Sequence, residues 1–239
     1  MLHRVLVHRS DPAAGLAHSP LQSATPIQAE PRWPVALAIL ALVMLLGILP
    51  DRVRFVSQWI VYFAGLIVLI PIAAVAATKS SFWLRVERAV MLAAFVLAAA
   101  ATVINLLNLV TVMIERPKDV SGVQLLSSSI GVWVTNVIMF SLLYWQIDRD
   151  GPETRLNPHE TKPDWLFPQE TAPSATVPVD WRPTFVDYLY LGFSTATAFS
   201  TTDAMPLTPR AKLLMMLEAS FSLTTIAVVA SRAINILGS

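Results

Sequence analysis

The chain has 239 residues, of which 55% are hydrophobic and 14% charged, and its formal net charge is +1. It contains no cysteine, which excludes disulfides and cysteine-ligated metals. The small net charge gives no global basic field that would attract nucleic acid. The four histidines show no ligand spacing, so we expect no metal, no other cofactor and no nucleic-acid partner. The sequence strings of common phosphate-binding loops and hydrolases are absent, and we do not expect an enzyme.

Five apolar blocks dominate the sequence, and a membrane-spanning helix needs about 20 such residues. The blocks cover 33–49, 55–77, 90–114, 125–145 and 211–237. They predict an all-α, polytopic membrane protein with about five transmembrane helices. The chain then divides into a tail (1–32), a four-helix transmembrane region (33–147), a proline-rich extramembrane loop (148–183) and a pore-like carboxyl-terminal unit (184–239).

The amino-terminal tail is polar and contains four prolines. Its low hydrophobicity predicts a disordered or loosely attached segment. Between the second and third blocks, Lys79, Arg85 and Arg88 stand with Glu87. We interpret this basic cluster as an interfacial anchor that helps to set topology, the alternative being a site for anionic lipid headgroups.

Polar side chains inside the third and fourth blocks have two interpretations. Asn105 and Asn108 are three residues apart and share one helical face, and Asn136 lies in the fourth block. Amides within a membrane usually hold helices together, which is the interpretation we favour. The alternative is that they line a water-filled path. The alanine-rich third block allows close helix approach, and we expect it to be central.

The loop 148–183 contains seven prolines, and its acidic residues outnumber its basic ones by seven to four. Proline-rich polar chain does not fold alone, which favours a solvated connector. An acidic vestibule that concentrates cations is the functional alternative. Trp165, Leu166, Phe167 and Trp181 are apolar, and we expect these parts of the loop to pack on the membrane-proximal surface.

The segment 187–203 is too short and polar for an easy span and too apolar for a surface loop, and we predict a re-entrant helix. Asp187 is suited to capping the start of that helix. The hydroxyl side chains of the segment 187–203 either bond back to carbonyls of the preceding turn or line a polar path. The pore-lining candidates of this unit are Tyr190, Ser194, Thr197, Ser200, Thr201, Thr202, Asp203 and, in the last block, Glu218.

Glu218 is exceptional because a carboxylate within a span is costly unless it is paired or hydrated. It lies eight residues after Arg210, or about 12 Å along a helix. Pairing with arginine or hydroxyl groups near the interface is one interpretation of this residue. An ion or proton site at the end of a water-filled cavity is the other.

The pattern of Asp203, Pro206 and Thr208, between a short helix and a final span, resembles the turn that follows the filter in potassium-channel pore domains. Residues 198–202 occupy the place of that filter and contain no glycine. Glycine makes the backbone conformations of a carbonyl filter accessible, so we do not expect potassium selectivity of that kind.

A second resemblance extends over about half of the chain. The sequences 140–145 (FSLLYW), 165–170 (WLFPQE), 185–190 (FVDYLY) and 200–203 (STTD) are similar to domain-of-unknown-function family 1345, a family of uncharacterised bacterial multi-pass membrane proteins. The resemblance implies a location in the bacterial inner membrane. It implies no activity and no catalytic residues.

These features favour a homo-oligomeric, channel-like pore that passes a small ion within a lipid membrane. The alternative is a structural or accessory membrane protein that does not conduct. The bias of lysine and arginine favours a cytoplasmic amino terminus, which puts the pore-like turn on the cytoplasmic side. A potassium-channel-like orientation needs the reverse, and the charge bias is too small to decide between the two.

Overall fold

The computed structural model describes residues 30–48, 57–78, 80–115, 122–156, 161–178, 180–197 and 203–237. These ranges are mostly helical, which confirms the predicted class. The α-helices are α1 (Trp33–Ile48), α2 (Gln58–Thr78), α3 (Ser81–Glu115), α4 (Gly122–Ile147), α5 (Pro168–Thr171), α6 (Phe185–Thr197) and α7 (Pro209–Leu237). Two 3-10 turns lie at Asp148–Asp150 and Thr154–Leu156, and two short strands are β1 (Trp165–Leu166) and β2 (Met205–Pro206).

Four helices are long and apolar enough to cross a membrane, namely α2, α3, α4 and α7. The first predicted block forms α1, an apolar helix of 16 residues, which is shorter than the other four. Helix α3 begins at Ser81, nine residues before the predicted block, because Phe82, Trp83 and Leu84 continue its apolar surface. Arg85 and Arg88 therefore lie on α3, and Lys79 is outside the described residues.

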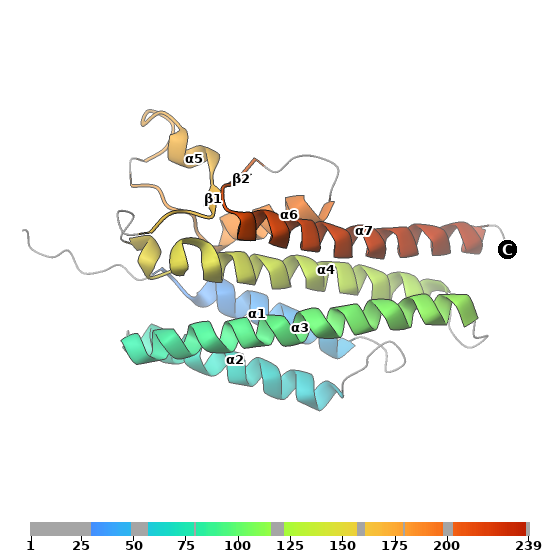
Figure 1. Ribbon diagram of the computed structural model, residues 1–239. Coiled ribbons are helices and arrows are strands. Elements are labelled where there is room, and N and C mark those ends of the chain that lie inside the picture. The colour runs from blue at the N-terminus through green and yellow to red at the C-terminus, as the bar shows by residue number, and fades with distance from the viewer. Residues whose placement is uncertain are drawn as a thin grey trace, which may run out of the picture.

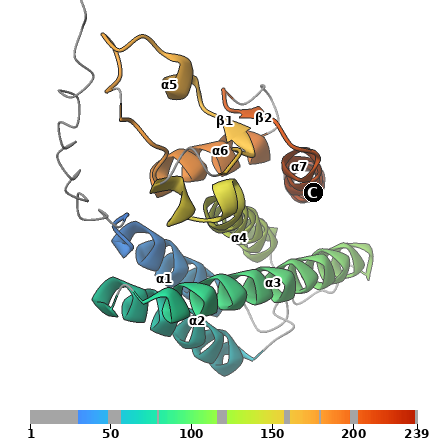
Figure 2. The ribbon, with the colours of Figure 1, turned by 60° about the vertical axis from the view of Figure 1, so that its left-hand side comes forward.

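The central helix is α4, which contacts α1, α3, α6 and α7 (Figure 1). The expectation that the third block is central was wrong, since the principal contacts of α3 are with α2 and α4 alone. In Figure 2, α1, α2 and α3 lie on one side of α4, while α6 and α7 lie on the other. The large side chains of Phe140, Tyr144 and Trp145 explain this position, because all three are fully buried around α4.

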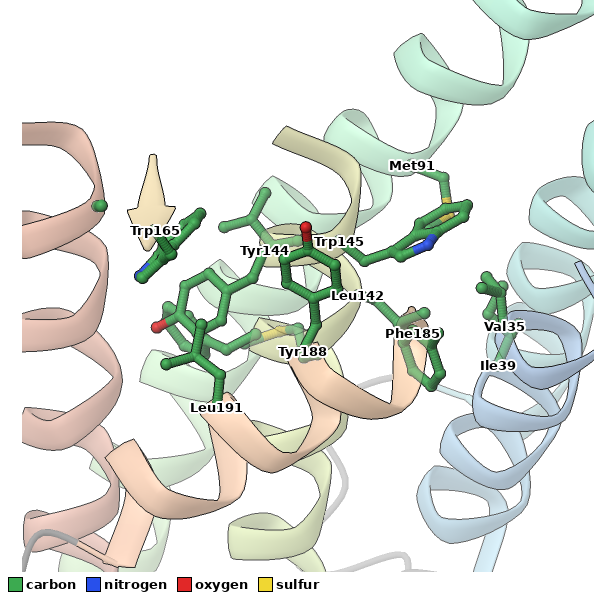
Figure 3. Packing of buried hydrophobic residues seen from close by; sticks show 14 of the residues in the cluster. Val35, Ile39, Met91, Leu142, Tyr144, Trp145, Trp165, Phe185, Tyr188 and Leu191 are labelled. Atoms are coloured by element: carbon green, nitrogen blue, oxygen red, sulfur yellow. The ribbon is translucent and has the colours of Figure 1, made fainter. Parts of the chain in front are cut away.

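The main hydrophobic core lies where α4, α6 and the loop after α4 meet (Figure 3). The ring of Tyr144 is 4.8 Å from that of Trp165, between centroids, and the ring of Phe167 is 5.4 Å from that of Tyr188. Trp165 is fully buried and Phe167 is nearly so, which confirms that these loop residues pack on the helices.

The strands β1 and β2 join the segments on the two sides of α6. They pair antiparallel, with Trp165 opposite Pro206 and Leu166 opposite Met205. The backbone N–H of Leu207 also donates to the carbonyl of Asp164 at 2.7 Å. The chain after α6 is thus attached to the loop before α6, at the end of the bundle where α6 begins (Figure 1).

Helix α6 begins at Phe185, and its amino-terminal end is capped by Asp187, the third residue of the helix. The carboxylate of Asp187 accepts hydrogen bonds from the backbone N–H and the hydroxyl of Thr184, at 2.7 and 2.8 Å. Asp187 therefore caps the helix as predicted, but it does so by reaching back from within the first turn.

Helix α6 approaches α4 closely at Gly192. A methyl group at this position would lie 2.4 Å from the Ser141 hydroxyl oxygen and 3.3 Å from a carboxyl oxygen of Glu218. A methyl group added at Gly131, on α4, would meet nothing within 4 Å. Of these two glycines, Gly192 is therefore the one that packing requires.

We expect Gly192→Ala to lower the free energy of unfolding by about 1–3 kcal/mol, because the added methyl overpacks the contact between α4 and α6. Gly131→Ala is the matched control and should be neutral or stabilising by about 0.5–1 kcal/mol, since it only improves helix propensity. Thermal unfolding in detergent measures both, and combining Gly192→Ala with Ser141→Ala should restore part of the loss. Equal effects of the two glycine substitutions would contradict the close approach.

Candidate functional site

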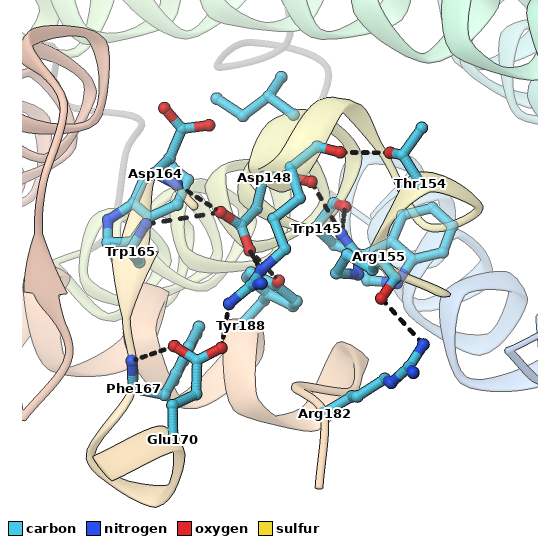
Figure 4. Close-up of polar contacts among 12 residues, drawn as sticks. Trp145, Asp148, Thr154, Arg155, Asp164, Trp165, Phe167, Glu170, Arg182 and Tyr188 are labelled. Atoms are coloured by element: carbon cyan, nitrogen blue, oxygen red, sulfur yellow. Dashed lines mark hydrogen bonds and ion pairs between the residues drawn. The ribbon is translucent and has the colours of Figure 1, made fainter. Parts of the chain in front are cut away.

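Charged side chains gather at the end of the bundle where α4 ends and α6 and α7 begin, and we call this group the terminal ion network (Figure 4). Its members lie between Glu30, three residues before α1, and Arg210, at the start of α7. They are Glu30, Arg32, Glu87, Asp148, Arg149, Glu153, Arg155, Asp164, Glu170 and Arg210.

Asp148 is a fully buried carboxylate of the network, and both of its oxygens accept hydrogen bonds. One of its oxygens accepts hydrogen bonds from the backbone N–H groups of Asp164 and Trp165, at 2.8 and 3.4 Å. The other oxygen accepts the hydroxyl of Tyr188 at 2.5 Å. Asp148 therefore ties the end of α4 to β1 and to α6.

The turn after Asp148 is sharp, with left-handed backbone conformations at Arg149, Asp150 and Gly151 (φ of 52°, 62° and 116°). This turn brings Arg155 back under the end of α4, where it is buried. Its guanidinium donates to the carbonyl of Trp145 at 2.6 Å and to the Glu30 carboxylate at 3.0 Å. A buried arginine is thus neutralised by a residue that precedes α1.

Trp145 contacts two guanidinium groups at the same end. Those of Arg32 and Arg155 lie 5.3 and 5.6 Å from its ring centroid, within range of a cation–π interaction. Its indole N–H donates to Glu30 at 2.8 Å. Glu30 and Arg32, which fall in the predicted tail, are therefore fixed to α4, whereas residues 1–29 are outside the described part of the chain.

Asp164 connects the loop to the start of α7. Its carboxylate accepts two hydrogen bonds from the Arg210 guanidinium, at 2.6 and 2.5 Å, and one from the Thr208 hydroxyl at 2.5 Å. Asp164 is fully buried. The interpretation of 148–183 as a solvated connector is therefore wrong for its buried part, because Asp148, Asp164 and Trp165 lie inside the protein.

Two further ion pairs complete the network. Arg149 pairs with Glu170, whose other oxygen accepts the Phe167 backbone N–H at 3.3 Å. Burial raises the pKa of the Glu170 carboxyl, and the charge of Arg149 opposes that shift. Near the start of α3, Glu87 lies 3.4 Å from the Arg32 guanidinium. The acids that could have formed an open acidic vestibule are thus largely paired with arginine.

A second group of polar residues lies deeper, between α4, α6 and α7, and we call it the buried carboxyl centre. It consists of Asn136, Tyr144, Gly192, Glu218 and Ser222. The hydroxyl of Tyr144 donates to Glu218 at 2.5 Å, and the Asn136 amide donates to the Ser222 hydroxyl at 2.8 Å. The same amide lies 3.3 Å from the backbone carbonyl of Glu218. Within the described ranges, the second carboxyl oxygen of Glu218 has no hydrogen-bond partner.

A small cavity of about 40 Å³ lies on the other side of α4, between α1 and α3. Asn105, Thr102 and Thr135 contribute its polar lining. The side-chain oxygens of Asn105 and Thr135 are buried without partners in the described structure. The side chain of Asn108 falls outside the described part, so the predicted face shared by the two asparagines stays a prediction.

The described hydroxyls among the predicted pore-lining residues bond largely within α6. The hydroxyls of Ser194 and Thr197 donate to the carbonyls of Tyr190 and Ser194, respectively. The exposed Tyr190 donates its hydroxyl to Asp203 at 3.1 Å. Ser200, Thr201 and Thr202 are outside the described residues. The structure thus brings Tyr190 and Asp203 together on the surface and places Glu218 inside, on the opposite side of α6.

Sequence reasoning did not single out Tyr144, Asp148 or Tyr188 as functional residues. Tyr144 and Asp148 are four residues apart at the end of α4. The Tyr144 hydroxyl donates to Glu218, and one turn later the Asp148 carboxylate accepts from Tyr188. An acidic residue directly after an apolar helix rich in aromatic residues was the available signal. It does not say which distant groups are the partners.

Comparisons with protein families, curated proteins and solved structures found no match to this chain. Among the described residues, no group of three or more histidine, aspartate or glutamate side chains could hold a metal ion.

We expect Asp148→Asn to lower the free energy of unfolding by about 2–4 kcal/mol, because three donors and a nearby arginine lose their buried negative charge. Asp150→Asn is the matched control, since its side chain is half exposed and pairs with the exposed Arg88. It should cost less than about 1 kcal/mol. Denaturation in detergent gives both values, and a loss of similar size in the two variants would show that Asp148 has no special role.

Proposed function

We propose that this chain is an integral membrane protein with five spans, in which α6 enters the bilayer part-way as a re-entrant pore helix. In a homo-oligomer, this unit provides a passage for a small ion. The observation that carries the proposal is that α6 has only 13 residues, while the segments on both sides of it are joined at one end of the bundle.

The length of α6 supports a partial entry. Thirteen residues extend about 20 Å as a helix, against about 30 Å for the hydrocarbon core of a bilayer. Phe185, at the start of α6, packs against Trp145 at the terminal ion network. Asp203 and β2, after α6, are held by Tyr190 and β1. The chain thus leaves on the side where it entered.

The fifth span in this proposal is α1. It extends about 24 Å, and a bilayer accommodates a short helix of this kind by local thinning or by snorkelling of flanking residues. Arg32 lies directly before α1, within the terminal ion network. With α1 counted, α1, α2, α3, α4 and α7 cross in alternating directions, as Figure 1 allows.

The helix dipole of α6 favours a cation as the permeant species. Its amino-terminal end lies at the ion network, so its carboxyl-terminal end, with a partial negative charge, lies further along the bundle, away from that network (Figure 1). Transporters and channels use half-helix ends to coordinate ions of opposite sign within the membrane. Asp203 adds a carboxylate beside Tyr190 on the same surface.

Several copies are needed because Tyr190 and Asp203 lie on the outside of one protomer. A water-filled route along them requires a second wall, which further copies of the chain supply. The exposed apolar residues of α7, among them Leu213, Met216 and Leu223, provide a surface for such contacts within lipid. The bacterial inner membrane remains part of this proposal as the location that the sequence resemblance implies, although no family model matches the chain.

A non-conducting accessory protein is the second candidate, and one observation favours it. The hydroxyls of Ser194, Thr195 and Thr197 bond to carbonyls of α6 itself. Hydroxyls of this kind contribute to packing and need no water-filled path. A measurement of ion flux separates the two candidates.

The re-entrant path predicts the side from which single cysteines react, and the chain offers a cysteine-free background. In sealed vesicles, Thr184→Cys and Asp203→Cys should react with a membrane-impermeant thiol reagent from the same side. Asp150→Cys should share that side, whereas Thr111→Cys, exposed near the far end of α3, should react from the other. Reaction of positions 184 and 203 from opposite sides would mean that α6 crosses the bilayer completely.

Ion passage predicts a flux in liposomes that contain the purified oligomer. Cations should pass faster than in protein-free liposomes, and Asp203→Asn should reduce the flux several-fold because it removes the charge that concentrates cations. Asp150→Asn is the control, as it removes an exposed carboxylate at the same end that pairs with Arg88. Liposomes that stay tight with folded oligomer present would support the accessory protein instead.

A further inference from the structure

Glu218 differs from the other fully buried carboxyl groups in its surroundings. Asp148 accepts two backbone N–H groups and the Tyr188 hydroxyl. Asp164 accepts two bonds from Arg210 and one from Thr208. Glu218 is equally buried, but in the described structure its carboxyl group accepts a side-chain hydrogen bond from a single neutral group, the Tyr144 hydroxyl.

Among the described residues, no positive charge faces Glu218 from the elements packed around it. On α4, the titratable neighbour is Tyr144, whose ring also contacts Trp165 of β1. On α6, Gly192, which lacks a side chain, lies next to a carboxyl oxygen of Glu218. Arg210, on α7 itself, is about 12 Å away along the helix and is held by Asp164. Among the described residues, Glu218 forms no ion pair.

An ionised carboxylate in this position would be costly. It offers about four acceptor sites, of which one oxygen is used by Tyr144 while the other has no partner in the described ranges. An unpaired charge buried in an apolar interior loses far more hydration than a single neutral hydrogen bond returns. A neutral carboxylic acid avoids this loss and still accepts the bond from Tyr144.

We propose that Glu218 is a proton-binding site that holds its proton while α6 is packed on α4 and α7. Loss of the proton would place a negative charge next to Gly192, where α6 packs closely against Ser141 of α4. The packing of the re-entrant helix is thereby linked to proton uptake. This inference concerns the folded protomer and does not depend on ion passage, so tight liposomes would leave it unaffected.

Infrared spectroscopy of the full-length protein in lipid tests the protonation state directly. At neutral pH, the wild type should show a protonated-carboxyl C=O band that shifts in D2O and is lost in Glu218→Gln. Gln keeps the size of the side chain and an oxygen that can accept from Tyr144, so this variant should fold. Tyr144→Phe should keep the band at a higher frequency, because the acid loses its donor.

An unchanged protonated-carboxyl band in Glu218→Gln, with a loss in the carboxylate region instead, would show that Glu218 is ionised and would overturn the proposal. The difference between wild type and Glu218→Gln removes the contributions of Glu87, Glu170 and other acids.

The pH dependence of stability gives an independent readout. An acid that keeps its proton more firmly in the folded state makes the protein less stable as pH rises, because the unfolded chain releases that proton more readily. Between about pH 5 and about pH 8, the melting temperature of the wild type should therefore fall relative to that of Glu218→Gln. A difference that is constant with pH would contradict a proton held at Glu218.

Discussion

The burial of Asp148 at the end of α4 is the constraint on which the carboxyl-terminal half depends. A fully buried carboxylate is tolerated only where donors surround it, and the backbone of β1 and the hydroxyl of Tyr188 provide them. These bonds fix the start of the loop and the first turns of α6 relative to α4. Once β1 is fixed, its pairing with β2 and the bonds of Asp164 to Arg210 determine where α7 begins. Each later element is thus positioned by a polar contact at the same end of the bundle.

The two polar groups serve different physical purposes. In the terminal ion network, the buried acids Glu87, Asp148 and Asp164 each have a cationic or backbone partner. Removal of one member therefore leaves its partner uncompensated. The buried carboxyl centre has no cation, and its geometry suits a neutral acid. Helix α4 connects the two groups, because Tyr144 and Asp148 are one turn apart and bond to α7 and α6, respectively. A change in the charge of Glu218 would therefore act on the same helix that Asp148 holds at its end.

The sequence predicted the helices well because apolar length is a local property. The block 211–237 corresponds to Pro209–Leu237, and the short helix expected within 187–203 is found at Phe185–Thr197. The partners of the charged residues could not be predicted, since Tyr144 and Glu218 are 74 residues apart and Asp148 and Tyr188 are 40 apart. Composition also suggested a solvated loop, because the prolines and acidic residues at 148–183 outnumber the few aromatic residues whose burial attaches the loop to the helices. Alanine content alone misplaced the central helix, since large buried side chains determine that position.

The conflict between charge bias and channel-like orientation does not alter the chemistry of α6 in the proposed re-entrant arrangement. Whichever side of the membrane carries the terminal ion network, α6 begins there and runs along α4 and α7 away from that end (Figure 1). The partial negative charge of that end is a property of the helix and not of the leaflet. Arg32, Arg155 and Arg210 at this end are paired with acids in the folded protein, so they present little free positive charge to a cation that approaches Asp203. The dipole and Asp203 thus act with the same sign in either orientation.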